Sequence, residues 1–200
     1  IATKHTKHPD KTIERIANYA CEKDLSKNSI VYSFGISKDI DFEKQIINSK
    51  NCKVYAYDPT PSSKIFTLNE IKKLELENML FFKQEGLWVE DGIQKFFIEN
   101  DSSDEGSITN LTQSDSSYEI QCHTLETLMK NNGHQSIDLL KMDIEGAAIK
   151  VLRSWIDMGT FIPNSIACEI EHPKHDDLWF NEVSDVLIDL EKINFEIFYL

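Results

Sequence analysis

Residues 137–151 constrain the fold more than any other part of the chain. They begin as an apolar run too short for a helix, which breaks at Asp143 and Gly146. Over residues 147–155 the apolar residues recur three and four positions apart, which is the spacing of one helix face. A strand therefore leads into a helix here, with Asp143 and Glu145 in the turn between them. In a parallel α/β sheet such a turn lies at the carboxyl edge of the strands, where ligands bind.

Strand-like and helical patterns alternate along the rest of the chain. Strands are predicted at residues 30–34, 52–58, 79–82, 137–142, 164–170 and 195–200. Helices are predicted at residues 10–25, 37–47, 61–74, 124–133, 147–155 and 176–192. This alternation is typical of an α/β protein with a doubly wound, mostly parallel sheet.

Two segments interrupt this regular pattern. Residues 85–98 follow the third predicted strand and predict a β-hairpin insertion there. Residues 99–117 are rich in serine and acidic residues, and they fit a surface loop and a lid over a site equally well. We expect a single domain over residues 1–200, with a leading helix segment at 1–27 and a core at 28–200, whose sheet lacks a seventh strand after Leu200.

Composition limits the partners. The net charge of −13 argues against nucleic acid, because binding a phosphate backbone requires a basic face. No apolar stretch reaches the ~20 residues of a membrane span, so we expect a soluble domain. The chain begins at Ile1 rather than Met, which indicates a trimmed N-terminus. The compartment and the oligomeric state therefore stay open.

The cysteines are far apart and three lie in or beside apolar runs, which favours core residues over disulfides: Cys21, Cys52, Cys122 and Cys168.

Polar groups and a glycine follow four of the predicted strands and would meet at one edge of the sheet. They are Gly35, Asp58, Asp143, and Glu169 with His172. A glycine after the first strand lets a ligand approach the backbone, and an acid after the second can accept both hydroxyls of a ribose. The first turn is not G-x-G-x-x-G and no P-loop occurs, which disfavours phosphate-bearing cofactors. S-adenosylmethionine, which has a cationic sulfonium and no phosphate, suits an acidic pocket.

Four blocks of sequence resemble the FkbM-type S-adenosylmethionine-dependent methyltransferases. They are Val31-Tyr32-Ser33-Phe34-Gly35, Tyr57-Asp58-Pro59-Thr60-Pro61, Gly86-Leu87-Trp88 and Leu139-Leu140-Lys141-Met142-Asp143-Ile144-Glu145-Gly146. The resemblance covers about residues 28–172, and its last block is the most specific. It implies a Rossmann-like class I methyltransferase fold and methyl transfer, usually to a hydroxyl oxygen of a sugar or another small molecule.

The resemblance also implies roles for individual residues. Ser33, Phe34 and Gly35 would lie along the methionine part of the cofactor, and Asp58 would bind its ribose. Glu85, Gly86 and Leu87 would border the adenine, and Asp143 would face the methyl-transfer centre. As the base that takes the acceptor's proton we expect His172 first, then Asp143 or Glu169.

Other interpretations stay open at the sequence level. Asp58 could instead cap the turn before Pro59, His172 could be a solvated loop residue, and Asp143, Glu169 and His172 could hold a divalent cation. The chain departs from the family pattern at Ala148, where a glutamate is usual, and at Glu171, where the histidine of a Glu-x-His ending is usual. Both departures slightly favour a non-catalytic binding or assembly module. An NAD-type oxidoreductase is disfavoured by the first turn.

Overall fold

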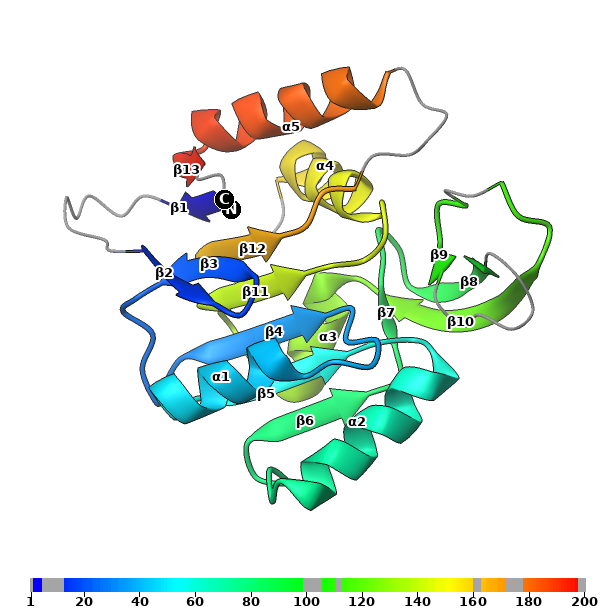
Figure 1. Cartoon of the computed structure of the whole chain (residues 1–200). Helices are drawn as coiled ribbons and strands as arrows, with labels where there is room; N and C mark the ends of the chain where they lie inside the picture. The colour runs from blue at the N-terminus through cyan, green and yellow to red at the C-terminus, as the bar shows by residue number, and fades with distance from the viewer. Residues whose placement is uncertain are drawn as a thin grey trace.

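A seven-stranded sheet forms the centre of the molecule (Figure 1). The computed structural model describes residues 2–4, 13–98, 106–110, 113–159, 163–171 and 178–197. The strands lie in the order β13-β1-β12-β11-β4-β5-β6. Five of them pair in parallel: β4 (Ile30–Phe34), β5 (Lys53–Tyr57), β6 (Leu80–Lys83), β11 (Leu139–Met142) and β12 (Ser165–Cys168). The predicted α/β class and the mostly parallel sheet are confirmed.

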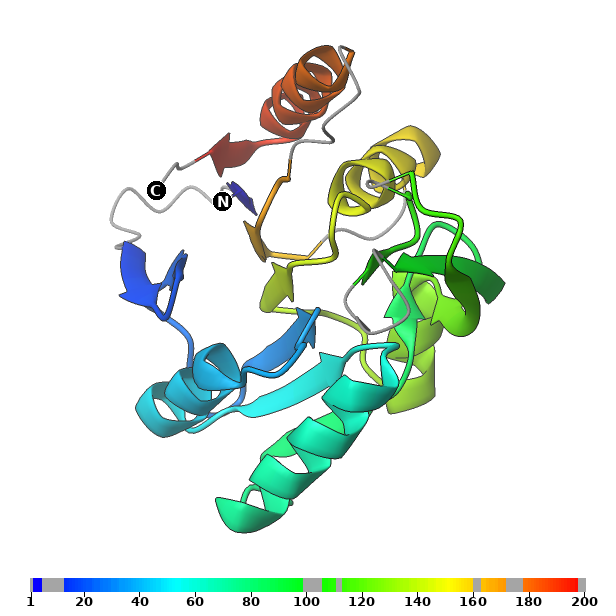
Figure 2. The ribbon, with the colours of Figure 1, turned by 45° about the vertical axis from the view of Figure 1, so that its right-hand side comes forward.

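Helices cover both faces of the sheet (Figure 2). One face packs against α1 (Asp41–Lys50) and α2 (Pro61–Lys73). The other packs against α3 (Leu125–Asn132), α4 (Ala148–Met158) and α5 (Trp179–Lys192). Because side chains alternate along a strand, β4, β5, β11 and β12 each contribute apolar residues to both cores, whereas the edge strand β6 contributes Leu80 and Phe82 to one.

The helix boundaries follow from local sequence signals. The Thr60 side chain accepts a hydrogen bond from the backbone N–H of Ser63, and Pro61 occupies the first turn of α2. At α3, Thr124 is the N-cap and Gly133 is the C-cap, with a left-handed φ of 73°. The predicted starts of these two helices, and the predicted end of α3, are therefore confirmed.

The excursion after β6 forms a second, smaller sheet. Its order is β7-β10-β8-β9, with bounds β7 (Gly86–Leu87), β8 (Gly92–Ile98), β9 (Gly106–Ser107) and β10 (Ser117–His123). β8 and β10 pair antiparallel along their length, and β7 pairs in parallel with β10. An insertion therefore follows β6 as predicted, but the hairpin predicted within residues 85–98 is wrong, because β10, from farther along the chain, lies between β7 and β8. Part of the polar segment is β9, which lies beside β8.

The leading helix predicted at residues 10–25 is wrong for the part that the structure describes. Residues 13–22 form an antiparallel hairpin of β2 (Ile13–Ile16) and β3 (Tyr19–Glu22). The apolar spacing fits a helix, but it also places Ile16 and Cys21 in the core beneath the hairpin. The backbone N–H of Ala17, in the turn, donates to Gln45 Oε1 of α1 at 2.9 Å. Tertiary contacts with α1 therefore outweigh the local helical pattern.

The expectation that the sheet lacks a seventh strand is also wrong. β1 (Ala2–Lys4) lies between β12 and β13 (Phe195–Ile197) and pairs antiparallel with both. The partner strand comes from the other end of the chain, a long-range pairing that no local pattern indicates.

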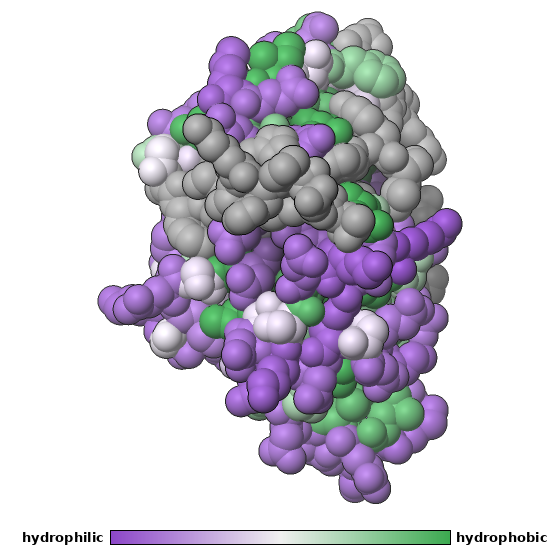
Figure 3. Space-filling view, turned by 90° about the vertical axis from the view of Figure 1, so that its left-hand side faces the viewer, coloured by the Kyte–Doolittle hydropathy of each residue, from purple (hydrophilic) through white to green (hydrophobic). Residues whose placement is uncertain are grey.

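The surface shown in Figure 3 is largely hydrophilic, in keeping with the net charge of −13. A hydrophobic patch lies at its lower end, at the height of α2 and β6 in Figure 1. Among the described residues, no helix has the length and apolar character needed to cross a membrane. The four cysteines are free, and three of them are buried, as the sequence predicts.

Candidate functional site at the carboxyl edge of the sheet

A cavity of about 240 Å³ opens where the parallel strands end. Its lining comes from the ends of β4, β5, β6 and β11 and from the small sheet. Seven of the eight predicted cofactor residues line it: Phe34, Gly35, Asp58, Glu85, Gly86, Leu87 and Asp143. The rings of Phe34 and Tyr57 stack beside it, with centroids 4.9 Å apart. A flat apolar surface thus lies among backbone groups and carboxylates.

Gly35 holds two strand ends in direct contact. Its φ is +77°, and a Cβ there would lie 1.6 Å from the carbonyl oxygen of Asp143. Its N–H donates to the Tyr57 carbonyl at 3.0 Å, and its carbonyl accepts from Lys141 Nζ at 2.5 Å. The turn after β4 therefore has to be glycine, and it joins β4, β5 and β11 at one point.

Asp58 is bound to its own chain. Oδ2 accepts from the backbone N–H groups of Ile36 and Ser37 at 2.9 and 2.8 Å. Oδ1 accepts from the backbone N–H and the hydroxyl of Thr60 at 2.9 and 2.6 Å. Four donors match the roughly four acceptor positions of a carboxylate. Asp58, 5% exposed, thus fixes the turn after β4 to the start of α2.

Ser33 is the predicted cofactor residue whose side chain does not line the cavity. It is fully buried, and its hydroxyl donates to Glu43 Oε1 of α1 at 2.5 Å. Along a strand neighbouring side chains point to opposite faces, so Phe34 faces the cavity and Ser33 faces α1. Glu43 is itself buried, and burial raises its pKa, while the nearby Lys141 opposes that shift.

The adenine-side residues predicted from the sequence form one wall. Gly86 and Leu87 make up β7, which pairs in parallel with β10, and a Cβ on Gly86 would lie 2.7 Å from Cys122 Sγ. Glu85 Oε2 is buried and has no hydrogen-bond partner among the described residues. An unpaired buried acceptor beside a cavity is costly unless a ligand donates to it.

The small sheet closes the cavity from the side opposite the strands. Phe96, Gly106 and Ile108 contribute to the lining. The Ser107 hydroxyl donates to the backbone carbonyl of Glu145, and the Thr109 hydroxyl donates to the same oxygen at 3.4 Å. Residues 106–110 thus line the cavity and are hydrogen-bonded to the loop after β11. Residues 99–105 and 111–112 of the predicted loop or lid lie outside the described residues.

Asp143 lies in the cavity wall with one oxygen engaged. Its Oδ2 accepts from the Tyr19 hydroxyl at 2.7 Å and lies 3.5 Å from Lys141 Nζ. Sequence reasoning missed Tyr19, which is 124 positions away, because the segment was assigned to a helix. Glu145, which follows two residues later, also lines the cavity with a left-handed φ of +49°.

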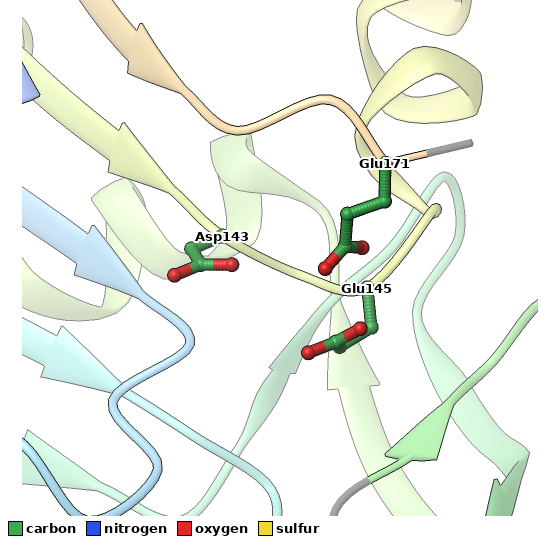
Figure 4. Close-up of side chains that lie close together, drawn as sticks. All are labelled: Asp143, Glu145 and Glu171. Carbon is green, nitrogen blue, oxygen red and sulfur yellow. The ribbon is translucent and has the colours of Figure 1, made fainter.

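Further carboxylates gather beside Asp143 (Figure 4). Asp143, Glu145 and Glu171 each place an oxygen within 4.8 Å of the others, a spacing that one cation can bridge. Burial raises the pKa of Glu171 to about 8, with a further contribution from its hydrogen bond to Glu145. Burial also raises the pKa of Glu169, as does the charge of Asp143. The negative charge of the carboxylates at this end of the cavity is therefore poorly balanced by cationic groups.

Two of the predicted catalytic residues, Asp143 and Glu169, are among the described residues and lie near each other. Glu169 follows β12 close enough to Asp143 for their charges to interact. His172 lies outside the described residues. Glu145 and Glu171 were not among the predicted site residues, although both stand within or next to the motifs at the two strand ends.

The strand order, the two helical layers and the cavity at the strand ends define a Rossmann-like α/β protein of the class I methyltransferase type. The sequence matches the Methyltransferase FkbM domain over residues 8–197. The chain belongs to this family. No curated protein sequence matches it.

Solved structures of other methyltransferases are similar to this chain. The methyltransferase FkbM from Methylobacillus flagellatus KT has a TM-score of 0.51 at 11% identity, covering 83% of this chain and 38% of that chain. This chain thus spans well under half of that protein. An rRNA methylase from Streptococcus thermophilus has a TM-score of 0.45 at 13% identity, covering 82% of this chain and 71% of that one. The Podospora anserina methyltransferase PaMTH1, bound to SAH, has a TM-score of 0.41 at 10% identity, covering 82% and 60%.

Proposed function

We propose that this chain is an S-adenosylmethionine-dependent methyltransferase domain that methylates a hydroxyl oxygen of a small molecule, such as a sugar. The observation that carries the proposal is the cavity at the strand ends, where an aromatic surface and a buried unpaired acceptor lie opposite a carboxylate. Family membership supports the same reaction class.

The residues around the cavity fit the cofactor. Glu85 Oε2 offers the missing acceptor for an amino group such as that of adenine, beside Gly86 and the apolar Leu87. Phe34 and Gly35 border the methionine part, whereas Ser33 contributes through its backbone only. Asp143 places negative charge where a sulfonium would lie, which favours a cation over a neutral group.

Asp58 has two roles in this proposal. It fixes the turn that the ribose lies against, and it accepts from a ribose hydroxyl once one of its four hydrogen bonds within the chain is exchanged for that contact. Asp58→Ala should weaken binding of S-adenosylhomocysteine about 30-fold, the equivalent of about 2 kcal/mol. A 2′-deoxy analogue separates the roles. If Asp58 contacts the ribose, Asp58→Ala should bind S-adenosylhomocysteine and its 2′-deoxy analogue with equal affinity. If Asp58→Ala still binds them with different affinities, Asp58 acts only in the turn.

The cofactor supplies an electrophilic methyl group, and the chain's residues align and deprotonate the acceptor. A general base works best when its pKa is near the operating pH. The pKa of about 8 for Glu171 meets this condition, so Glu171 joins Asp143, Glu169 and His172 as a candidate. A base within hydrogen-bond reach of the hydroxyl takes its proton as the oxygen attacks. The acidic field at this end also favours neutral or cationic acceptors over nucleic acid.

Calorimetry with S-adenosylmethionine tests the proposal first. We expect micromolar binding, and then transfer of labelled methyl to at least one member of a panel of hydroxyl-bearing sugars and alcohols. Transfer only to nitrogen or sulfur acceptors would contradict O-methylation but not the cofactor.

Two observations favour a second function, that of a non-catalytic module with the same fold. The carboxylate of Asp58 is saturated by the chain's own donors, and Ala148 replaces the usual glutamate. An absence of heat with S-adenosylmethionine at high protein concentration would support this alternative.

A further inference from the structure

The β2–β3 hairpin brings one polar group to the carboxyl end of β11. The hydroxyl of Tyr19 donates to Asp143 Oδ2 at 2.7 Å. Burial raises the pKa of Tyr19, and the hydrogen bond to Asp143 raises it further, so the phenol stays protonated and acts as a donor to Asp143. Burial raises the pKa of the neighbouring Glu169 and a hydrogen bond from Tyr19 opposes that rise, so the hydroxyl lies within reach of both carboxylates. Both described contacts of the Asp143 carboxylate use Oδ2.

A cation competes for the same oxygen. Lys141 Nζ forms a long ion pair with Asp143 Oδ2 at 3.5 Å, and it also donates to the Gly35 carbonyl at 2.5 Å. The ammonium also lies 5.3 Å from the centroid of the Tyr19 ring. Lys141 is 5% exposed, so its charge is poorly screened by water.

The position of Tyr19 is set from α1 rather than from the cavity. Its ring meets Phe42 edge to face, with centroids 5.4 Å apart. Lys50 of α1 forms an ion pair with Glu14 of the hairpin, and the turn is tied to Gln45. These contacts with α1 therefore hold the Tyr19 hydroxyl in its position beside Asp143.

We infer that Tyr19 is a positioning residue for Asp143, and that its hydroxyl keeps the carboxylate facing the cavity instead of turning to Lys141. The inference rests on the proposed function. With the hydroxyl in place, Oδ2 is held and the charge stays next to the cationic centre of the cofactor. Without it, the existing ion pair with Lys141 is free to shorten, and a shorter contact would offset more of the charge that the cavity presents.

The test compares S-adenosylmethionine, which is cationic at sulfur, with S-adenosylhomocysteine, which is neutral there. The ratio of their dissociation constants, measured by calorimetry, reports on Asp143 and needs no acceptor. Tyr19→Phe removes one oxygen and keeps the ring on Phe42. We expect it to reduce the preference for the cationic ligand about 3- to 10-fold, less than a whole charge-assisted hydrogen bond, because Asp143 keeps its charge in the variant. Affinity for S-adenosylhomocysteine should change less than about twofold.

Tyr55→Phe is the matched control, because Tyr55 lies on the other face of the sheet, stacked on Phe81 at 5.2 Å. It should leave the ratio unchanged. Asp143→Asn gives the second check. If Tyr19 acts through Asp143, adding Tyr19→Phe to Asp143→Asn has no further effect on the ratio. Full additivity, or an unchanged ratio in Tyr19→Phe, would overturn the inference. Failure of the wild-type chain to bind either ligand would overturn the proposed function, and this inference with it.

Discussion

The two ends of the cavity satisfy their carboxylates in opposite ways. At the β5 end, Asp58 receives four hydrogen bonds from the chain itself. At the β11 and β12 end, Asp143, Glu145 and Glu171 lie close together, and the pKa of Glu171 is raised to about 8. The first end is built for rigidity, since every acceptor is paired. The second retains unbalanced charge, which a cationic ligand or a proton transfer can use.

The largest expected effect comes from the glycine that joins the two ends. In Gly35→Ala, the new Cβ would lie 1.6 Å from the Asp143 carbonyl oxygen, so β4 and β11 must separate. We expect a loss of about 4 kcal/mol in the free energy of unfolding, or no folded protein. Urea denaturation followed by circular dichroism measures it.

Gly133→Ala is the control, because Gly133 has a similar φ of +73° and a Cβ added there would meet nothing within 4 Å among the described residues. It should cost only about 1 kcal/mol, the penalty of the left-handed backbone alone. Equal losses in the two variants would show that the contact between the strand ends is unimportant.

The next largest effect compares the two ends of the cavity directly, through the free energy of unfolding of one variant at each end. Asp58→Asn keeps the shape but leaves one oxygen to accept from four donors, so we expect a loss of about 2 kcal/mol. Asp143→Asn still accepts from Tyr19 and reduces the repulsion with its carboxylate neighbours. Its free energy of unfolding should stay within about 0.5 kcal/mol of wild type at neutral pH. A loss in Asp143→Asn as large as that in Asp58→Asn would remove the contrast.

The smallest effect is a pH dependence at the acidic end. Because the folded-state pKa of Glu171 is raised to about 8, the folded chain holds this proton more tightly than the unfolded chain. The stability from this group is therefore present at low pH and is lost as the pH rises towards 8. Glu171→Gln should be more stable than wild type by about 1 to 2 kcal/mol at about pH 9, a figure reduced for solvent screening, and equal to it below about pH 5.

Glu77→Gln, at an exposed position after α2, serves as the control for this pH dependence. It should show no difference between the two pH values. A wild-type stability that stays flat from about pH 5 to about pH 9 would show that Glu171 ionises normally.

Much of the fold could be predicted because its signals are local. The caps Thr60, Thr124 and Gly133 act within one turn of their helices, and the apolar runs of the parallel strands are continuous. The β2–β3 hairpin could not be predicted, because the spacing of its apolar residues also fits a helix. Its contacts with Gln45 and Phe42 of α1 decide between the two structures.

The site was predictable at the level of strand ends but not of side-chain partners. Placing Asp58, Asp143 and Glu85 at one edge needs only the βαβ pattern. The side on which Ser33 points depends on the register of β4. The Tyr19 contact with Asp143 joins distant segments, and the pairing of Glu145 with Glu171 depends on the alignment of β11 with β12.

At Glu145, the stability of the fold and the presence of a carboxylate in the cavity wall impose opposite requirements on the residue. A non-glycine residue with a φ of +49°, followed by Gly146 at +75°, holds the loop after β11 in a conformation that glycine adopts at lower energy. A second glycine there would relax the loop by about 1 kcal/mol, but it would remove a carboxylate from the cavity wall. Selection for thermal resistance alone would favour that exchange. Retention of the acid during such selection, in a population that also needs the activity, would mark Glu145 as part of the working site.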